Sequence, residues 1–161
     1  MRTWKLLTPL LALGLAWGQA LPKLGFLEAA RTAEAHLRSP TPPEEISLSW
    51  REGRPVYGVD LARGAYLVQV YVDGESGKVL GQKPLKERAL GARAWLRTPP
   101  GIPLKEAVAR AQKALGTGEA PAEVAYQVWR GRPVLRVDIG ARQAILDAKT
   151  GALLGTAPAG K

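Results

Sequence analysis

The sequence predicts an α+β protein built from two tandem repeats, each a helix packed on an antiparallel β-meander of about three to four strands. Three kinds of segment occur twice in the same order: a helix-like run, a strand pair with a tryptophan, and an Asp-x-x-Ser/Thr-Gly hairpin. Most matched positions lie 78 residues apart, as for Glu28 and Glu106, Val56 and Val134, and Asp60 and Asp138. Because self-similarity at a fixed spacing is typical of repeated structural units, the duplication predicts architecture before chemistry.

The repeat spacing divides the chain into four segments. Residues 1–20 form a predicted signal peptide, 21–83 the first repeat, 84–100 a connector and 101–158 the second repeat. The connector mixes basic and apolar side chains, and either an ordered connector or a basic amphipathic helix broken at Gly91 fits this pattern. The ordered connector is the preferred interpretation.

The amino terminus has the pattern of a secretory signal peptide. Arg2 and Lys5 precede an apolar run at 6–18, and small residues lead to a predicted cut after Ala20. The run is shorter than the roughly 20 apolar residues that a membrane span needs, although an uncleaved anchor is the alternative. The pattern therefore predicts a secreted, periplasmic or cell-envelope protein, with membrane contact only through this segment if it stays uncleaved.

Composition excludes several classes of site. The 161 residues include no cysteine, which excludes a disulfide framework, a thiolate metal site and a lipid-carrying cysteine in this sequence. The net charge is +9, or +7 without Arg2 and Lys5, which favours acidic partners such as an anionic envelope polymer or membrane surface. Nucleic acid is not expected as a partner of an exported protein. The absence of asparagine and cysteine fits a thermophilic source, and GC-rich coding gives the same bias.

Helical spacing followed by alternation defines the elements of the first repeat. Leu24 and Leu37 bound an alanine-rich helix, which Pro40 ends. The predicted strands are 46–51, 55–61, 65–72 and 78–80. Tyr57 and Val59 alternate with more polar neighbours, which predicts one core face and one polar face.

The second repeat shows the same order, with a helix at 102–115 and strands at 123–130, 133–139, 142–148 and 152–154. It is four residues shorter near Gly140, because the spacing falls from 78 to 74 after its second strand. If Trp50 is matched with Trp129, the apolar face of the first strand is reversed between the repeats. A β-bulge or a difference in register would each explain this reversal.

These segments resemble the PepSY domain. The resemblance covers residues 27–37 with 50–80, and 104–115 with 129–154. It implies a helix laid over an antiparallel sheet and a role in binding or restraining peptidases. Tandem copies also resemble the β-lactamase inhibitory protein, in which paired sheets make a concave binding face. In the second repeat Leu135 replaces the tyrosine at position 57, so the two binding faces need not be equivalent.

The resemblance predicts an exported, non-catalytic module that binds, and inhibits or otherwise regulates, an extracytoplasmic peptidase. An envelope-associated module that binds anionic polymer or membrane through its basic charge is the alternative. Aromatic side chains supply most anchors at protein interfaces. The predicted partner-binding residues are Trp50, Tyr57, Tyr66, Tyr71, Trp129, Asp60 and Asp138. Asp60 and Asp138 have a second interpretation, in which they pair with Arg54 or Arg132 on a neighbouring strand.

Other candidate groups point away from catalysis. His36 is the single histidine and is interpreted as a solvated residue at a helix end. Asp73 and Asp147 have too few oxygen ligands nearby for a calcium loop. They are predicted to accept backbone N–H groups in turns closed by Gly77 and Gly151. The sequence thus predicts no catalytic residue, metal or cofactor.

Overall fold

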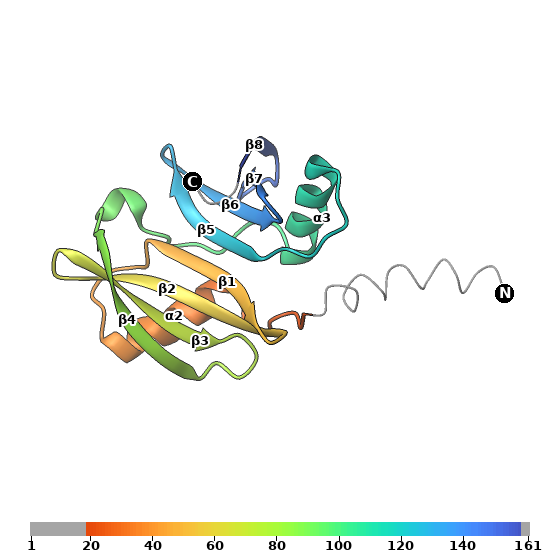
Figure 1. Ribbon diagram of the computed structural model, residues 1–161. Coiled ribbons are helices and arrows are strands. Elements are labelled where there is room, and N and C mark those ends of the chain that lie inside the picture. Colours follow the sequence, from red (N-terminus) through yellow and green to blue (C-terminus); the bar gives the residue numbers. More distant parts are fainter. Residues whose placement is uncertain (1–18, 159–161) are drawn as a thin grey trace.

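The computed structural model describes residues 19–158 (Figure 1). The predicted signal peptide therefore lies outside the described residues, except for Gln19 and Ala20. No helix in the described part of the chain is long and apolar enough to cross a membrane.

Residues 19–158 contain two runs of one helix and four strands. The first run comprises α2 (Phe26–Leu37), β1 (Glu45–Arg51), β2 (Arg54–Arg63), β3 (Tyr66–Asp73) and β4 (Val79–Arg88). The second comprises α3 (Leu104–Leu115), β5 (Glu123–Trp129), β6 (Arg132–Ile139), β7 (Arg142–Asp147) and β8 (Leu153–Pro158). A short 3-10 helix, η1 (Ala92–Ala94), lies between them.

All eight strands belong to one antiparallel sheet with the order β4-β3-β2-β1-β5-β6-β7-β8. The prediction of two tandem repeats, each a helix on its own meander, is therefore wrong. The sheets join because β1 and β5 pair from Glu45 opposite Gln127 to Ser49 opposite Glu123. Without this pairing, β1 and β5 would each leave a row of unpaired backbone N–H and C=O groups at the edge of a sheet. In the joined sheet these groups bond to one another.

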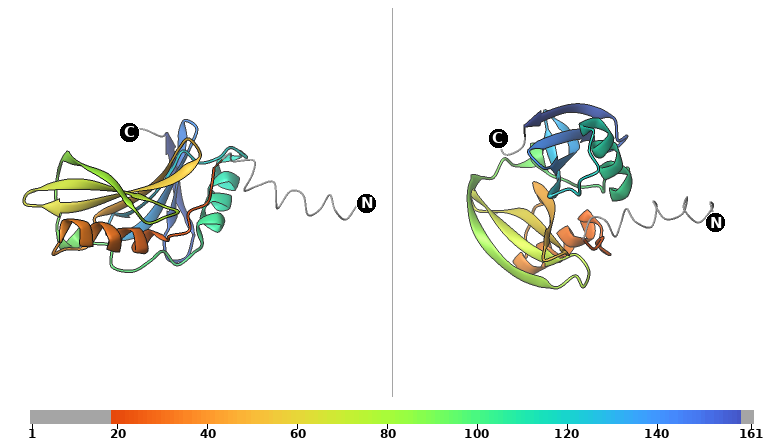
Figure 2. Two further views of the ribbon diagram at one scale, coloured as in Figure 1. Left: turned by 90° about the horizontal axis from the view of Figure 1, so that it is seen from below. Right: turned by 45° about the vertical axis from the view of Figure 1, so that its right-hand side comes forward.

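Helices α2 and α3 share one hydrophobic core. Figure 2 shows α2 beside the first four strands and α3 beside the last ones. The Phe26 ring of α2 lies edge-on to Tyr57 of the first half at 5.4 Å and to Tyr126 of the second at 5.9 Å. One cluster of buried side chains therefore continues across the β1–β5 junction.

The first hairpins of the two halves have the same geometry. Two-residue turns join the strands, Glu52-Gly53 in one half and Arg130-Gly131 in the other. All four residues have positive φ, near 52° for the first and near 79° for the second position of each turn. This is the pattern of the type I′ turn that suits two-residue hairpins.

The matching turns show that the apolar face of the first strand is not reversed between the halves. Arg51 pairs with Arg54, and Trp129 pairs with Arg132, directly before and after the turns. Trp129 is therefore equivalent to Arg51, and Trp50 is equivalent to Val128. The spacing of 78 holds through this hairpin, with neither a bulge nor a register difference. Matching the tryptophans with each other was wrong by one residue.

The four residues missing from the second half shorten one hairpin without changing its faces. Strands β2 and β3 have 10 and 8 residues, whereas β6 and β7 have 8 and 6. Both hairpins turn at a glycine with positive φ, Gly64 and Gly140. Because each strand loses two residues, every remaining side chain keeps its face.

The segment between the halves folds back into the core. β4 continues to Arg88, and the chain then makes the single turn of η1. Leu96 is 2% exposed, and its N–H donates to the Pro43 carbonyl at 2.9 Å. The basic amphipathic helix considered for this segment does not form.

Candidate functional site

Helices α2 and α3 pack on one face of the sheet, and we call the opposite face the open face. Strand alternation places on it Glu45, Ser47, Gly58, Asp60, Gln69 and Tyr71 in the first half. In the second half it carries Glu123, Gln127, Trp129, Arg136, Asp138 and Gln143. This face is the candidate site, because polar and aromatic side chains gather there while the other face is filled by the core.

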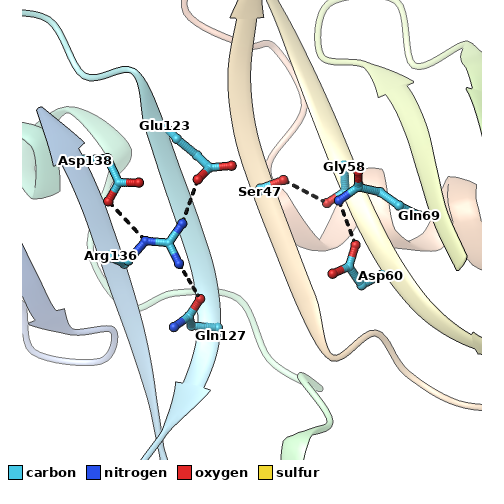
Figure 3. A network of polar contacts seen from close by, with 8 residues as sticks. All are labelled: Ser47, Gly58, Asp60, Gln69, Glu123, Gln127, Arg136 and Asp138. Carbon is cyan, nitrogen blue, oxygen red and sulfur yellow. Dashed lines mark hydrogen bonds and ion pairs between the residues drawn. The ribbon is translucent and has the colours of Figure 1, made fainter. Parts of the chain in front are cut away.

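An arginine organises the open face of the second half (Figure 3). The Arg136 guanidinium donates to Glu123 Oε1 at 2.6 Å, to Asp138 Oδ1 at 3.0 Å and to Gln127 Oε1 at 3.0 Å. The Arg136 side chain is only 20% exposed. A planar, multi-donor guanidinium suits such a set of acceptors, so the network holds three strand side chains in place.

The first half has a glycine where the second has this arginine, because Gly58 is equivalent to Arg136. Asp60 instead accepts a hydrogen bond from the Gln69 amide at 2.8 Å. The Ser47 hydroxyl donates to the Gly58 carbonyl at 3.4 Å. Figure 3 shows the two networks on either side of the β1–β5 junction. The carboxylates of the first half therefore have no arginine at their centre.

This difference changes the electrostatics of Asp60. The residue is 7% exposed, and burial, followed by the negative charge of Glu45, raises its pKa to about 7. The hydrogen bond from Gln69 opposes the rise. Burial also raises the pKa of Glu45, and the charge of Arg136 works against it. On the open face of the first half, burial thus disfavours the ionised forms of both Asp60 and Glu45.

Cavities lie on both faces of the sheet. One of about 480 Å³ opens beside Asp60, Glu45 and Glu87, and another of about 380 Å³ lies over the Arg136 network beside Trp129. A mainly apolar cavity of about 560 Å³ lies between the starts of α2 and α3. We place the site on the open face because charged groups of several strands converge there.

Two of the predicted aromatic residues lie on the open face. The Arg51 guanidinium stands 4.7 Å from the centre of the Tyr71 ring. Arg130 stands 4.4 Å from the centre of the Trp129 ring. Such cation–π contacts hold a ring in place while leaving part of it accessible. Tyr71 and Trp129 are therefore suitable interface anchors.

The other predicted aromatics lie elsewhere. Tyr57 is 1% exposed, its hydroxyl donates to the Leu24 carbonyl at 2.6 Å, and burial raises its pKa. Trp50 packs against the core, and its indole N–H donates to the Ala20 carbonyl at 2.8 Å. The prediction for Tyr57 is therefore wrong, because its ring is enclosed in the core. Trp50 is only partly buried, on the helix face, and its partner-binding role stays a prediction. Tyr66 is 48% exposed at the start of β3, where Arg88 covers its ring at 5.2 Å.

The predicted pairing of Asp60 and Asp138 with arginines on neighbouring strands is also wrong. Asp60 binds Gln69, and Asp138 binds Arg136 on its own strand. Arg54 pairs with Asp73 at 3.2 Å, and the equivalent Arg132 pairs with Asp147 at 3.4 Å.

The turn role of Asp73 and Asp147 is confirmed. Asp73 Oδ1 accepts the N–H groups of Glu75 and Ser76 at 2.8 and 2.9 Å. Asp147 makes the same two bonds to residues 149 and 150. These backbone donors lower the pKa of both carboxyl groups.

Several open-face residues escaped the sequence interpretation, namely Glu45, Gln69, Glu123, Gln127 and Arg136. A signal for them existed. The constant spacing of 78 matches Glu45 with Glu123 and Gly58 with Arg136, and the spacing of 74 matches Gln69 with Gln143. Matching the tryptophans concealed it in the first strand. Within residues 19–158 no three His, Asp or Glu side chains gather in a way that could hold a metal ion.

Comparison with known proteins gives a fold and no family. No protein-family model matches the sequence, and no curated protein matches it. The crystal structure of a "putative lipoprotein" from Clostridium difficile 630 is similar, with a TM-score of 0.70 and 14% identity. The match covers 87% of this chain and 96% of that one. At this identity the likeness shows a shared fold alone, and membership of the PepSY family stays a prediction.

Proposed function

We propose that this chain is an exported, non-catalytic module that binds a partner protein through the open face of its sheet. The observation that carries the proposal is the joined sheet, which is covered by helices on one face only and presents Tyr71 and Trp129 beside charged networks on the other. The PepSY resemblance supports an extracytoplasmic peptidase as the partner, which the module would restrain or inhibit.

The open face has the composition that protein interfaces favour. Tyrosine, tryptophan and arginine dominate binding energy at interfaces, and here each aromatic ring is already positioned by an arginine. Preorganised side chains lose less entropy on binding. A partner would therefore gain affinity from Tyr71 and Trp129 with little entropic cost for ordering these two side chains.

A second candidate function is attachment to an anionic envelope polymer or membrane surface. The net charge of +9 supports it, as does the description of the Clostridium difficile neighbour as a lipoprotein. Against it, Arg54, Arg132 and Arg136 are paired with carboxylates. An envelope location is compatible with both functions.

Capture from the secreted and envelope fractions of the source organism separates the two functions. Immobilised wild-type chain should retain a peptidase at moderate salt, because contacts through aromatic anchors are screened less than exposed charges. Trp129→Ala and Tyr71→Ala should each lower retention. Leu153→Ala is the matched control. Leu153 is 51% exposed, and it pairs with Leu146, whose side chain lies in the core. Leu153 therefore lies on the helix face and not on the open face.

The retained fraction is then assayed for peptidase activity with and without added chain. Loss of activity that follows binding across the variants supports restraint of the enzyme. Retention of polymer or lipid alone, released by salt and equal in all variants, would replace the proposal with the envelope function. Circular dichroism of each variant tests whether its fold is intact.

A further inference from the structure

The halves of the open face differ at one central position. In the second half the Arg136 guanidinium lies between Glu123 and Asp138. In the first half the equivalents of these acids, Glu45 and Asp60, are both present, but the position of the arginine is Gly58. The first half thus retains the acceptors and lacks the cation.

The acceptors line the cavity of about 480 Å³ that opens on this side. Glu45, Asp60 and Glu87 contribute carboxyl groups to its wall, and within residues 19–158 none of the three forms an ion pair. Arg88 also lines the cavity, but its guanidinium lies 5.2 Å from the centre of the Tyr66 ring and donates to the Tyr66 hydroxyl. Glu44 also lines it, but its carboxylate accepts the N–H groups of Leu90 and Gly91 at 2.9 to 3.1 Å. Three acidic groups therefore remain for a ligand.

Asp60 is the most enclosed of these groups. It is 7% exposed, and its Oδ1 accepts the Gln69 amide, while Oδ2 has no hydrogen-bond partner within the described residues. Oδ2 is not one of the fully buried, unpaired side-chain atoms of the described residues, so a donor can reach it from the cavity. A guanidinium arriving there would form a charge-assisted hydrogen bond.

We propose that this acidic pocket binds an arginine side chain of the partner protein, in the way that the second half holds its own Arg136. The inference rests on the proposed function and names the chemistry of the partner. A guanidinium carries five N–H donors and can serve several carboxylates at once.

The walls of the cavity also favour a long basic side chain over a metal ion. Leu67, Leu85 and Leu90 line it together with the acids. An arginine places an aliphatic stem against such apolar side chains and its charge among the acceptors. A space of about 480 Å³ exceeds the needs of a single ion.

A titration of the full chain with N-acetyl-arginine N-methylamide, followed by NMR, tests the pocket without the partner. We expect saturable shifts at the amides around Glu45, Asp60 and Gln69. The citrulline analogue has nearly the same shape and no charge, and we expect it to bind at least about ten-fold more weakly. Equal binding of both probes, or no saturation with the arginine probe, would overturn the proposal.

The second half supplies the design of the blocking variant. A Cβ at position 58 would lie 2.9 Å from Ser47 Oγ and 3.0 Å from Gln69 Nε2. The equivalents of these residues are Ala125 and Gln143, so the second half accommodates a glutamine beside its arginine and needs no serine there. Ser47→Ala/Gly58→Arg therefore gives the first half its own guanidinium, and it should weaken the arginine probe by about ten-fold or more. Asp60→Asn should do the same if the double variant fails to fold. Glu75→Gln, in an exposed turn, is the charge-matched control and should bind normally.

The same variants separate this inference from the proposed function. If a peptidase binds the wild type and both pocket variants equally well, the arginine pocket is refuted and the binding module stands. If the arginine probe binds as expected but no peptidase is retained, the pocket stands and the peptidase partner is refuted. Weaker retention of the peptidase by both pocket variants, with Glu75→Gln unchanged, supports both.

Discussion

The two halves of the sheet are alike on the helix face and different on the open face. Leu48 pairs with Tyr57 in the first half, and Tyr126 pairs with Leu135 at the equivalent places in the second. Each half thus holds one tyrosine and one leucine in the same cross-strand pair, in opposite order. The two hydroxyls donate to main-chain carbonyls at 2.6 Å, and both rings contact Phe26.

On the open face, no described residue of the first half takes the place of Arg136 in this way. Gly58 stands where the second half has Arg136, and within residues 19–158 no other residue of the first half forms an ion pair with Glu45 or Asp60. Cores tolerate swaps that conserve volume, because packing is their main requirement. The halves therefore share one stabilising face, whereas their open faces carry different polar groups.

Asp60 should give the protein a strong pH dependence that the second half does not share. Its pKa is raised to about 7, so the folded state holds the proton more tightly than the unfolded state. The resulting stability is fully present below about pH 4 and is lost as pH rises through about 7, with a magnitude on the order of 4 kcal/mol. In urea unfolding between pH 4 and 8, the free energy of unfolding of Asp60→Asn should not show this loss. An unchanged difference from wild type across this range would contradict the prediction.

Removing the arginine should make the second half resemble the first. Arg136→Met keeps much of the side-chain volume but leaves Glu123 and Asp138 without their cation, so we expect about 3 kcal/mol of destabilisation at neutral pH. Ser47→Ala, on the same face of the first half, breaks only a hydrogen bond of 3.4 Å and should cost less than about 1 kcal/mol. Equal losses in urea unfolding would show that the two networks matter equally.

The helix face should respond alike in both halves. Tyr57→Phe and Tyr126→Phe each remove one hydroxyl that donates to a main-chain carbonyl, and each should cost about 1 kcal/mol. Thermal unfolding measures the two variants under identical conditions. A large difference between them would mean that the swapped tyrosines are not equivalent in the core.

The smallest effects should come from the last hairpins, where the halves are most alike. The lowered pKa values of Asp73 and Asp147 mean that their stabilisation is present above about pH 4 and is lost as pH falls further. Asp73→Asn and Asp147→Asn should therefore each flatten the acid side of the stability profile, to a similar small extent. A strong effect in one half only would contradict this symmetry.

Local patterns predicted the elements better than their assembly. The helices at Phe26–Leu37 and Leu104–Leu115 fall inside the predicted ranges, because apolar spacing and the flanking proline or glycine define them. The pairing of β1 with β5 left no local signal. Any first or last strand of a meander has an unpaired edge, and the sequence does not say which two edges meet.

The candidate site was predicted only in part, for a related reason. Tyr71 and Trp129 lie where an interface anchor is accessible, but Tyr57 and Trp50 belong to the other face. A large aromatic residue fits a core as well as an interface, so residue type alone does not assign its face. The turn residues with positive φ fixed the register, and they identify Gly58 as the counterpart of Arg136.

The most direct test of the open face as the binding surface compares partner retention at moderate salt by wild type, Trp129→Ala, Tyr71→Ala and Leu153→Ala. The structure predicts strong loss for the two open-face variants, with Leu153→Ala equal to wild type and all four chains folded. Retention that is equal for the open-face variants and wild type, or that falls only for Leu153→Ala, would contradict the account and place binding elsewhere.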